Sequence, residues 1–311
     1  MRDERNGNLS RSATELRERI LVSSTVPSVV DVPWLLAHRG DPGVRVVDVR
    51  WSLAAPGRDA YAKGHVAGAA FVDLDTELSA ATGPGRHPIP SAARVAEVFG
   101  ALGVGPETHV VAYDDAAGSV AARAWFLLRG YGHDRVSILD GGFPAWVAAG
   151  GPVSTDVPTF LPRALALREA LPEGEVVDKP HVRALSDRRD ASVRLVDVRA
   201  RPRYLGETEP VDARPGHIPG AKSVPWSENV VTSPDDAAPH LRSAAELRAL
   251  YTRALGDARE VVFYCGSGVT ASLAVLAFER ADLPGVRARL YEGSYSDWAR
   301  DPSLPVAHGD E

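Results

Sequence analysis

The sequence predicts an α/β protein made of two copies of one domain, each a mainly parallel sheet flanked by helices. Three observations predict this fold class. Several short motifs occur twice in the same order, at an offset of about 150 residues, and in both copies short apolar runs alternate with helical patterns. The length of 311 residues also suits about two domains. Strands that alternate with helices favour right-handed crossovers and therefore parallel pairing.

Five motif pairs define the two copies. Val46–Arg50 (VVDVR) returns as Leu195–Arg199 (LVDVR), and Gly64–Ala69 (GHVAGA) returns as Gly216–Ala221 (GHIPGA). The other pairs are Val29–Pro33 with Val176–Pro180, Val110–Tyr113 with Val261–Tyr264, and Gly141–Trp146 with Gly293–Trp298. Five matches in register indicate a tandem duplication.

These matches set the expected boundaries of domains and elements. We expect a polar tail over residues 1–24, helical over 13–21, then domains over residues 25–150 and 175–308, joined by a proline-rich linker over 151–174. In the first copy the expected strands are 44–49, 110–113 and 137–139, and the expected helices are 92–102 and 119–129. In the second copy the expected strands are 195–198, 261–264 and 289–291, and the expected helices are 244–255 and 270–280.

The composition is that of an ordinary globular protein. Hydrophobic residues make up 44% and charged residues 24%, which excludes a disordered chain. The net charge of −6 argues against a nucleic-acid partner, because neutralising phosphates requires a basic face. Apolar runs such as Leu273–Phe278 are too short to cross a membrane. Residues 1–20 lack the apolar core of a signal peptide, so we expect a cytoplasmic location and no membrane partner.

The single cysteine, Cys265, is the first candidate for chemistry. One thiol excludes an intrachain disulfide and a cysteine-rich metal centre, so we expect no metal. Cys265 follows an expected strand and precedes Gly266–Thr270, after which a helix begins. Ligands of parallel sheets bind at this edge, and the N–H groups of such a turn together with a helix N-terminus favour a thiolate. The alternative is a buried structural cysteine, which is disfavoured because Gly-x-Gly predicts an exposed turn.

Three segments together resemble a known family. Cys265–Ala271 (CGSGVTA), Gly216–Ala221 and Gly293–Trp298 look like the two-domain sulfurtransferases of the rhodanese superfamily, and the first is similar to the loop of 3-mercaptopyruvate sulfurtransferases. The resemblance covers about Val26 to Val306. It implies tandem rhodanese-like domains, a non-catalytic first copy, a catalytic second copy, and no organic or metal cofactor.

The internal alignment supports this division of labour. Opposite Cys265 the first copy carries Asp114, which cannot carry sulfur, and with Asp115 it would repel an anionic substrate. The first copy can still form one wall of a cleft between the domains. Arg123 follows one turn into the next helix, and the resemblance implies that it binds the substrate anion, for which a guanidinium is suited. Without the resemblance, a solvated helix-face arginine is the simpler interpretation.

The resemblance also implies a proton relay that joins the two domains. Ser267 would be grouped with a histidine and an aspartate of the first domain, which are His87 and Asp75 here, with Asp73 competing for the role of Asp75. The alternative for His87 is an ordinary loop histidine. The backbone of Gly266, Gly268, Val269 and Thr270 is expected to bind the donor.

Several other residues have structural interpretations. His65 and His217, and likewise the pairs Asp48/Arg50 and Asp197/Arg199, recur in both copies and are therefore expected to hold the fold. Four tryptophans are expected in the core or at the domain interface: Trp125, Trp146, Trp226 and Trp298. Arg203 and Arg214 belong to an insertion of the second copy, and we favour solvated surface positions over a role in lining the cleft.

These observations predict sulfur transfer from 3-mercaptopyruvate, through a persulfide on Cys265, to a thiol, a thioredoxin-like protein or cyanide. A loop without Lys or Arg suits a monocarboxylate better than the thiosulfate dianion, so a thiosulfate:cyanide sulfurtransferase is the alternative. A cysteine phosphatase or arsenate reductase would need an arginine where Ala271 stands. A non-catalytic rhodanese-type binding module is the remaining alternative.

Overall fold

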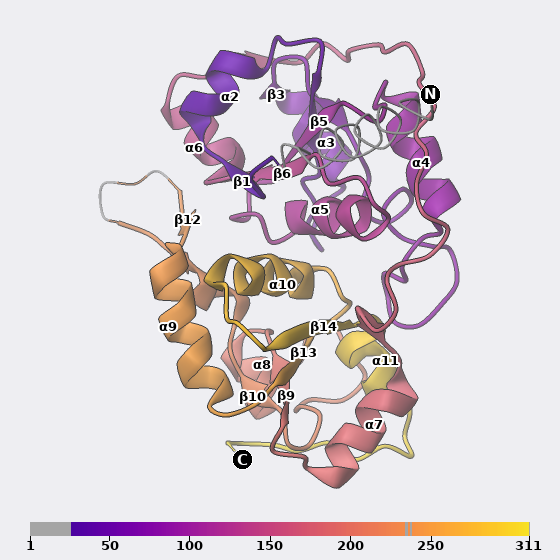
Figure 1. Ribbon diagram of the computed structural model, residues 1–311, viewed down its shortest axis with the longest axis vertical. Coiled ribbons are helices and arrows are strands. Elements are labelled where there is room, and N and C mark those ends of the chain that lie inside the picture. The colour runs from indigo at the N-terminus through magenta and orange to yellow at the C-terminus, as the bar shows by residue number, and fades with distance from the viewer. Residues whose placement is uncertain (1–25, 234–235, 237, 311) are drawn as a thin grey trace, which may run out of the picture.

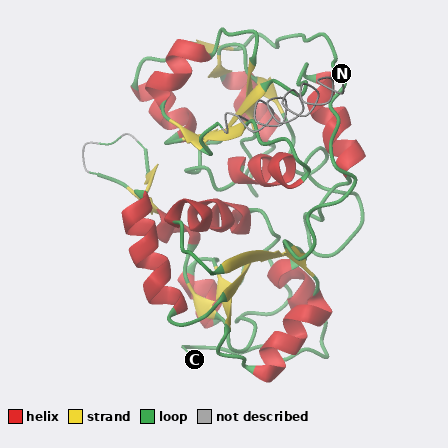
Figure 2. Cartoon of the chain, in the orientation of Figure 1, coloured by secondary structure: helices red, strands yellow, loops and turns green. Residues whose placement is uncertain are grey.

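The structure is a computed structural model that describes residues 26–233, 236 and 238–310. The expected polar tail over residues 1–24, with its helix over 13–21, lies outside the described residues. The described chain forms two α/β units, one above the other in Figure 1, and each has a five-stranded parallel sheet between helices (Figure 2).

The sheet of the first unit has the order β1-β6-β5-β2-β4. Its strands are β1 (Val29–Val30), β2 (Val44–Asp48), β4 (Ala70–Phe71), β5 (His109–Tyr113) and β6 (Val136–Leu139). Its helices are α2 (Val32–His38), α3 (Gly57–Lys63), α4 (Ala92–Ala101), α5 (Ala121–Gly130) and α6 (Gly142–Ala148). A small antiparallel pair joins β3 (His65–Val66) to β7 (Val153–Ser154).

The second unit repeats this topology strand for strand, in the order β8-β14-β13-β9-β10. Its strands are β8 (Val176–Val177), β9 (Val193–Asp197), β10 (Lys222–Ser223), β13 (Glu260–Tyr264) and β14 (Arg287–Tyr291). Its helices are α7 (Lys179–Arg188), α8 (Arg201–Leu205), α9 (Ala244–Leu255), α10 (Thr270–Ala281) and α11 (Ser294–Arg300). Between β10 and α9 lie a 3-10 turn, η1 (Trp226–Asn229), and the hairpin of β11 (Val230–Val231) and β12 (His240–Leu241). The identical strand order confirms the predicted fold class of two similar parallel-sheet domains.

Within the described residues every expected helix and strand is present, and several further short elements were not predicted. Helix α9 has the predicted bounds, and it begins with a capping box between Ser243 and Glu246. Helices α2 and α7 are too short, or too polar, for a helical period to stand out. Both begin alike, because Asp31 and Asp178 each accept an N–H from the first turn and a proline follows.

The recurrent charged pairs and histidines are buried, as predicted for residues that hold the fold. In each copy the arginine binds the aspartate two residues earlier, with 2.6 Å between Nη2 and Oδ2. The same Nη2 donates to a glycine carbonyl of the GH motif, that of Gly64 or Gly216. The rings of His65 and His217 stack on tyrosines at 3.8 Å and 3.7 Å. These contacts tie the end of a central strand to the next turn.

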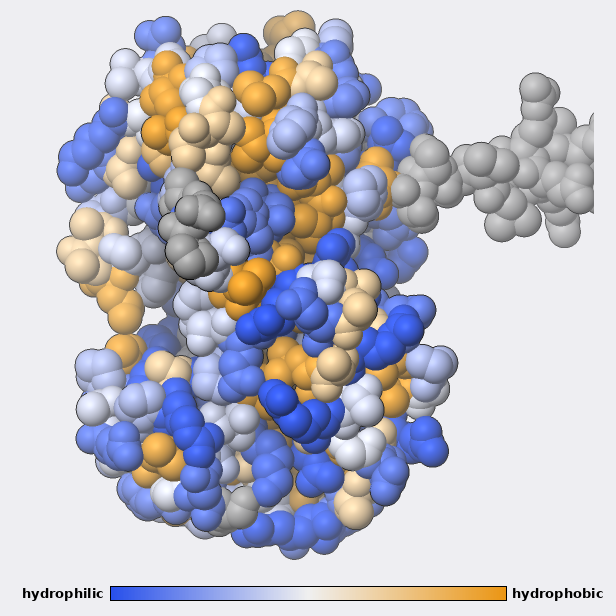
Figure 3. Space-filling model, turned by 90° about the vertical axis from the view of Figure 1, so that its left-hand side faces the viewer, coloured by the Kyte–Doolittle hydropathy of each residue, from blue (hydrophilic) through white to orange (hydrophobic). Residues whose placement is uncertain are grey.

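The two units meet along helices α5 and α10, which pack against each other at the centre of Figure 1. One continuous apolar cluster runs through both helices. Of the four tryptophans, Trp125, Trp146 and Trp298 are buried, and Trp226 packs partly buried against this cluster, as expected. In the space-filling view the two lobes meet at a narrower waist (Figure 3).

A second connection is made by residues 79–90 of the first domain, which we call the strap. Two backbone N–H groups of the strap reach the second domain. The N–H of Arg86 donates to Ser296 Oγ at 3.2 Å, and the N–H of Ile89 donates to Glu292 Oε1 at 2.6 Å. Since Glu292 and Ser296 follow β14, the strap crosses the carboxyl edge of the second sheet, where Cys265 also lies.

Candidate active site

Cys265 lies at the carboxyl end of β13, in the loop that leads into α10. Its sulfur accepts the N–H of Gly268 at 3.1 Å and that of Ser267 at 3.4 Å. Gly268 has φ +80, and a β-carbon there would stand 2.8 Å from the carbonyl oxygen of Glu292. This position therefore requires glycine. The loop is the predicted N–H nest, and the first N–H groups of α10 beside it have no acceptor within the helix.

The expectation of an exposed turn is wrong, because Cys265 is only 2% exposed. The strap of the first domain covers the loop. His87 of the strap contacts Ser267, and Arg86 lies against Gly266. Cys265 therefore lies where polar groups of the strap meet its loop, and it also belongs to the continuous apolar cluster that runs through α5 and α10.

Ser267, His87 and Asp75 are brought together in a chain of hydrogen bonds. His87 Nδ1 lies 2.8 Å from Ser267 Oγ, and His87 Nε2 lies 2.9 Å from Asp75 Oδ1. A carboxylate only accepts, so Nε2 carries the hydrogen and Nδ1 accepts from the serine hydroxyl. Asp73 does not reach His87, because it accepts from the N–H and hydroxyl of Thr76 in a local turn.

The environment of His87 keeps the imidazole neutral. Burial lowers the pKa of His87, while the hydrogen bond and charge of Asp75 act in the opposite direction. Trp51 borders the pair. Its indole donates to Asp75 Oδ2 at 3.0 Å, and its ring meets that of His87 edge-on at 5.4 Å. Sequence reasoning missed Trp51, which carries no motif signal of its own.

The first domain has the equivalent nest, and its own aspartate fills it. Asp114 is fully buried, and its carboxylate accepts four backbone N–H groups at 2.7–2.8 Å, from Ala116, Gly118, Val120 and Ala121. The sequence suggested that carboxylates here would repel a substrate. The structure provides a more direct reason for the lack of a site, since the anion position is already occupied by Asp114.

Arg123 is completely buried and lies against the loop of Cys265. Its Nη2 donates to the carbonyl of His87 at 2.9 Å and to that of Pro88 at 3.2 Å. Its Nη1 has no hydrogen-bond partner within the described part of the chain and lies 3.8 Å from where a β-carbon of Gly268 would stand. Burial lowers the pKa of Arg123 to about 10, so the guanidinium stays charged at pH 7. The simpler interpretation, a solvated helix-face arginine, is wrong.

Two further arginines differ from their expected surface positions. Arg214 donates to four backbone carbonyls around the end of α11, those of Trp298, Ala299, Asp301 and Leu304. Arg203 pairs with Glu209 and Asp212 and approaches Gly266. A third, Arg86, was missed as a functional candidate, although it directly precedes His87 in the sequence. The favoured solvated interpretation of Arg203 and Arg214 is therefore wrong, because their partners come from segments that folding brings together.

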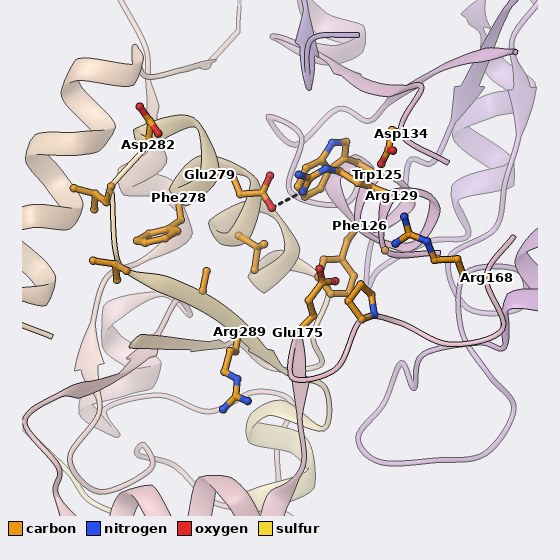
Figure 4. A pocket seen from close by; sticks show the side chains of 16 residues that line it. Trp125, Phe126, Arg129, Asp134, Arg168, Glu175, Phe278, Glu279, Asp282 and Arg289 are labelled. Atoms are coloured by element: carbon orange, nitrogen blue, oxygen red, sulfur yellow. Dashed lines mark hydrogen bonds and ion pairs between the residues drawn. The ribbon is translucent and has the colours of Figure 1, made fainter. Parts of the chain in front are cut away.

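A cavity of about 460 Å³ lies elsewhere along the domain interface, between the later turns of α5 and α10 (Figure 4). Figure 4 shows Trp125, Phe126 and Arg129 facing Phe278 and Glu279 across it, and Arg129 is paired with Glu279. Glu279 is nine residues beyond Thr270, which places this cavity roughly 13 Å along the helix from the cysteine loop. None of the predicted site residues lines it.

Two findings concern other classes of site and apply to the described residues only. Among residues 26–233, 236 and 238–310, no group of three or more His, Cys, Asp or Glu side chains is arranged to hold a metal ion. Within the same part of the chain, no helix combines the length and the apolar character needed to cross a bilayer.

Known proteins are similar to this chain along most of its length. The family model described as Rhodanese-like domain matches residues 31–149 and 181–301. A relative from Mycobacterium tuberculosis, provisionally named thiosulfate sulfurtransferase SseB, is 40% identical over 88% of this chain and 94% of its own length. The 3-mercaptopyruvate sulfurtransferase of Escherichia coli is 33% identical over 89% of this chain and 96% of its own.

A solved structure agrees with these relatives. The crystal structure of SseA from Escherichia coli superimposes with a TM-score of 0.72 at 30% identity, covering 86% of this chain and 99% of SseA. The family model covers both units, and its matched residues include the strap and the loop of Cys265. The chain therefore belongs to the rhodanese family, and it is a two-domain sulfurtransferase.

Proposed function

We propose that the protein transfers sulfur from 3-mercaptopyruvate through a persulfide on Cys265, with Ser267, His87 and Asp75 as the proton relay. The observation that carries this proposal is the chain of hydrogen bonds from Ser267 through His87 to Asp75, which starts two residues from the sulfur. Arg123, with Nη1 directed at Gly268, is proposed to attract the anionic donor toward the loop. The backbone of Gly266, Gly268, Val269 and Thr270 is proposed to hold the transferred sulfur.

The first half-reaction balances with no outside proton. The thiolate of Cys265 forms an S–S bond to the donor sulfur, the donor C–S bond breaks, and its electron pair leaves on the pyruvate enolate. The hydrogen of the donor thiol passes through Ser267 to neutral His87 and returns to the enolate carbon, which yields pyruvate. The persulfide anion remains on Cys265, where the N–H groups of the loop stabilise it.

This relay is the reason to prefer 3-mercaptopyruvate over thiosulfate. A carbon leaving group must gain a proton, whereas sulfite leaves from thiosulfate as a stable oxyanion and needs none. The neutral loop alone supports the choice less than the sequence suggested, because Arg86 and Arg203 border Gly266. Those two cations, together with the name of the mycobacterial relative, make thiosulfate the second candidate donor.

The second half-reaction requires an outside acceptor. Cys265 is the only cysteine of the chain, so no internal thiol can discharge the persulfide. The thiolate of an acceptor attacks the outer sulfur, the S–S bond breaks, and Cys265 regains its thiolate. We propose a small thiol, a thioredoxin-like protein or cyanide as acceptor, without an organic or metal cofactor, and a cytoplasmic location.

Comparison of the two donors tests the proposed function. We expect 3-mercaptopyruvate to add about 32 Da, one sulfur atom, to the intact protein, and Cys265→Ser to abolish both this adduct and turnover. A kcat/KM at least about tenfold higher for thiosulfate than for 3-mercaptopyruvate would overturn the choice of donor. An adduct that persists in Cys265→Ser would overturn the assignment of the nucleophile.

The pH dependence tests the role of His87. The relay works only while His87 is neutral, and its pKa lies below the ordinary value of 6.5, so activity should be lost only as the pH falls below about 6.5. Asp75 raises this pKa, so Asp75→Asn should move the acid limb to lower pH while it reduces the rate at pH 7. The measurement is a pH profile of kcat/KM with 3-mercaptopyruvate. An acid limb that Asp75→Asn leaves in place would show that another group titrates.

A further inference from the structure

Two guanidinium groups from different domains approach the residue after the nucleophile. A β-carbon placed on Gly266 would stand 2.6 Å from Nη2 of Arg86 and 3.6 Å from Nη1 of Arg203. Arg86 belongs to the strap of the first domain, and Arg203 belongs to α8 of the second. The loop itself contains no Lys or Arg, but two positive charges from other segments of the chain lie beside it.

Both guanidinium groups are held in place by carboxylates. Asp212 accepts from Nη1 of Arg86 through Oδ1 and from Nη2 of Arg203 through Oδ2, the latter at 2.8 Å. Glu209 accepts from Nε and Nη2 of Arg203 at 3.1 Å and 2.7 Å. The side chains of Asp212 and Glu209 are each 2% exposed, so they act as buried supports and not as surface counterions.

Each of the two guanidinium groups keeps one terminal nitrogen that the carboxylates do not bind. Among the described residues no acceptor is found for Arg86 Nη2 or Arg203 Nη1, and these two atoms stand nearest to the β-carbon position of Gly266. The arginine side chains are 27% and 19% exposed, so both remain partly open to solvent. Two fixed donors that converge beside a nucleophile suit an oxyanion with two oxygens, either a carboxylate or a sulfur oxyanion.

We propose that Arg86 is a substrate-binding residue that forms, with Arg203, a clamp across Gly266 for the oxyanion end of the sulfur donor. This inference rests on the proposed function, since the donor is the molecule that must be anchored while Cys265 attacks its sulfur. The clamp is completed only when the strap docks on the second domain. The first domain thus supplies substrate contacts through the strap, besides the buried Arg123.

Kinetics of two Arg86 variants test the clamp. Arg86→Gln removes the charge and should raise KM for 3-mercaptopyruvate about 10- to 100-fold with a smaller change in kcat, because one charge-assisted contact is lost. Arg86→Lys keeps the positive charge but loses the paired N–H donors of the guanidinium, so its KM should lie between those of Arg86→Gln and the parent. Arg248→Gln, an exposed arginine on α9 paired with Asp282, serves as the control and should leave KM unchanged.

Direct binding separates failure of the clamp from failure of sulfur transfer. The parent for this test is Cys265→Ser, which cannot react, and the probes are pyruvate and thiosulfate in titration calorimetry. We expect Arg86→Gln in this background to weaken binding about 10- to 100-fold for the anion that binds more tightly. Tighter binding of pyruvate supports a carboxylate donor, and tighter binding of thiosulfate keeps the clamp while contradicting the proposed donor.

The outcomes that overturn the clamp are also distinct. An unchanged affinity in Arg86→Gln, or no measurable binding of either anion to Cys265→Ser, would overturn it whether or not the native enzyme forms a persulfide. Native enzyme that forms no adduct with any donor, while Arg86→Gln still weakens anion binding, would overturn the proposed function and leave the clamp intact.

Discussion

Ser267→Ala and His87→Ala should each lower kcat for 3-mercaptopyruvate about 10²- to 10³-fold while changing turnover of thiosulfate far less. Removing either residue breaks the path between the donor thiol and the enolate carbon, and general acid–base catalysis is typically worth this much. Thiosulfate needs no such proton, so the same variant carries its own control for folding and for the reactivity of Cys265. The measurement is steady-state kinetics with both donors.

A matched pair of carboxylates sharpens this experiment. Asp75→Asn should share the effect of His87→Ala, whereas Asp73→Asn should not, because Asp73 only caps a turn through Thr76. Equal losses with both donors in Ser267→Ala would contradict the relay and assign the serine to stabilising the sulfur through the loop. Equal losses in Asp73→Asn and Asp75→Asn would point to a structural role for the whole turn.

Asp114→Ala should destabilise the protein by roughly 3 kcal/mol or more, although it lies in the domain without a nucleophile. The substitution removes a buried carboxylate that accepts four N–H groups and leaves those donors without acceptors. Asp114→Asn, which keeps one acceptor oxygen, should cost less. The measurement is the free energy of unfolding from urea denaturation.

Asp115 provides the control for this stability experiment. It is the exposed neighbour of Asp114, so Asp115→Ala should change the free energy of unfolding by no more than about 0.5 kcal/mol. A loss in Asp114→Ala as small as that in Asp115→Ala would show that water replaces the carboxylate in the nest. The nest would then be open to an outside anion, contrary to the occupancy seen in the structure.

The local sequence was sufficient to predict the two domains and the loop of Cys265. Duplicated motifs and alternating apolar runs predicted two parallel-sheet domains, and the strand, glycine and helix signals around Cys265 predicted its loop. Short helices such as α3 and α8 were missed because seven or five residues give no readable helical period. The surface positions of Arg203 and Arg214 were predicted wrongly because their partners are set by folding and not by neighbouring residues.

The sequence by itself therefore determined the duplication, the fold class and the position of the one thiol. Only the tertiary structure decided that the strap buries Cys265, that Asp75 and not Asp73 reaches His87, and that Arg86 comes to Gly266. His87 and Ser267 are 180 residues apart, and they meet because α5 packs on α10 and the strap docks on the second domain. Contacts across an interface depend on how two finished surfaces fit, and no local period or motif encodes that fit.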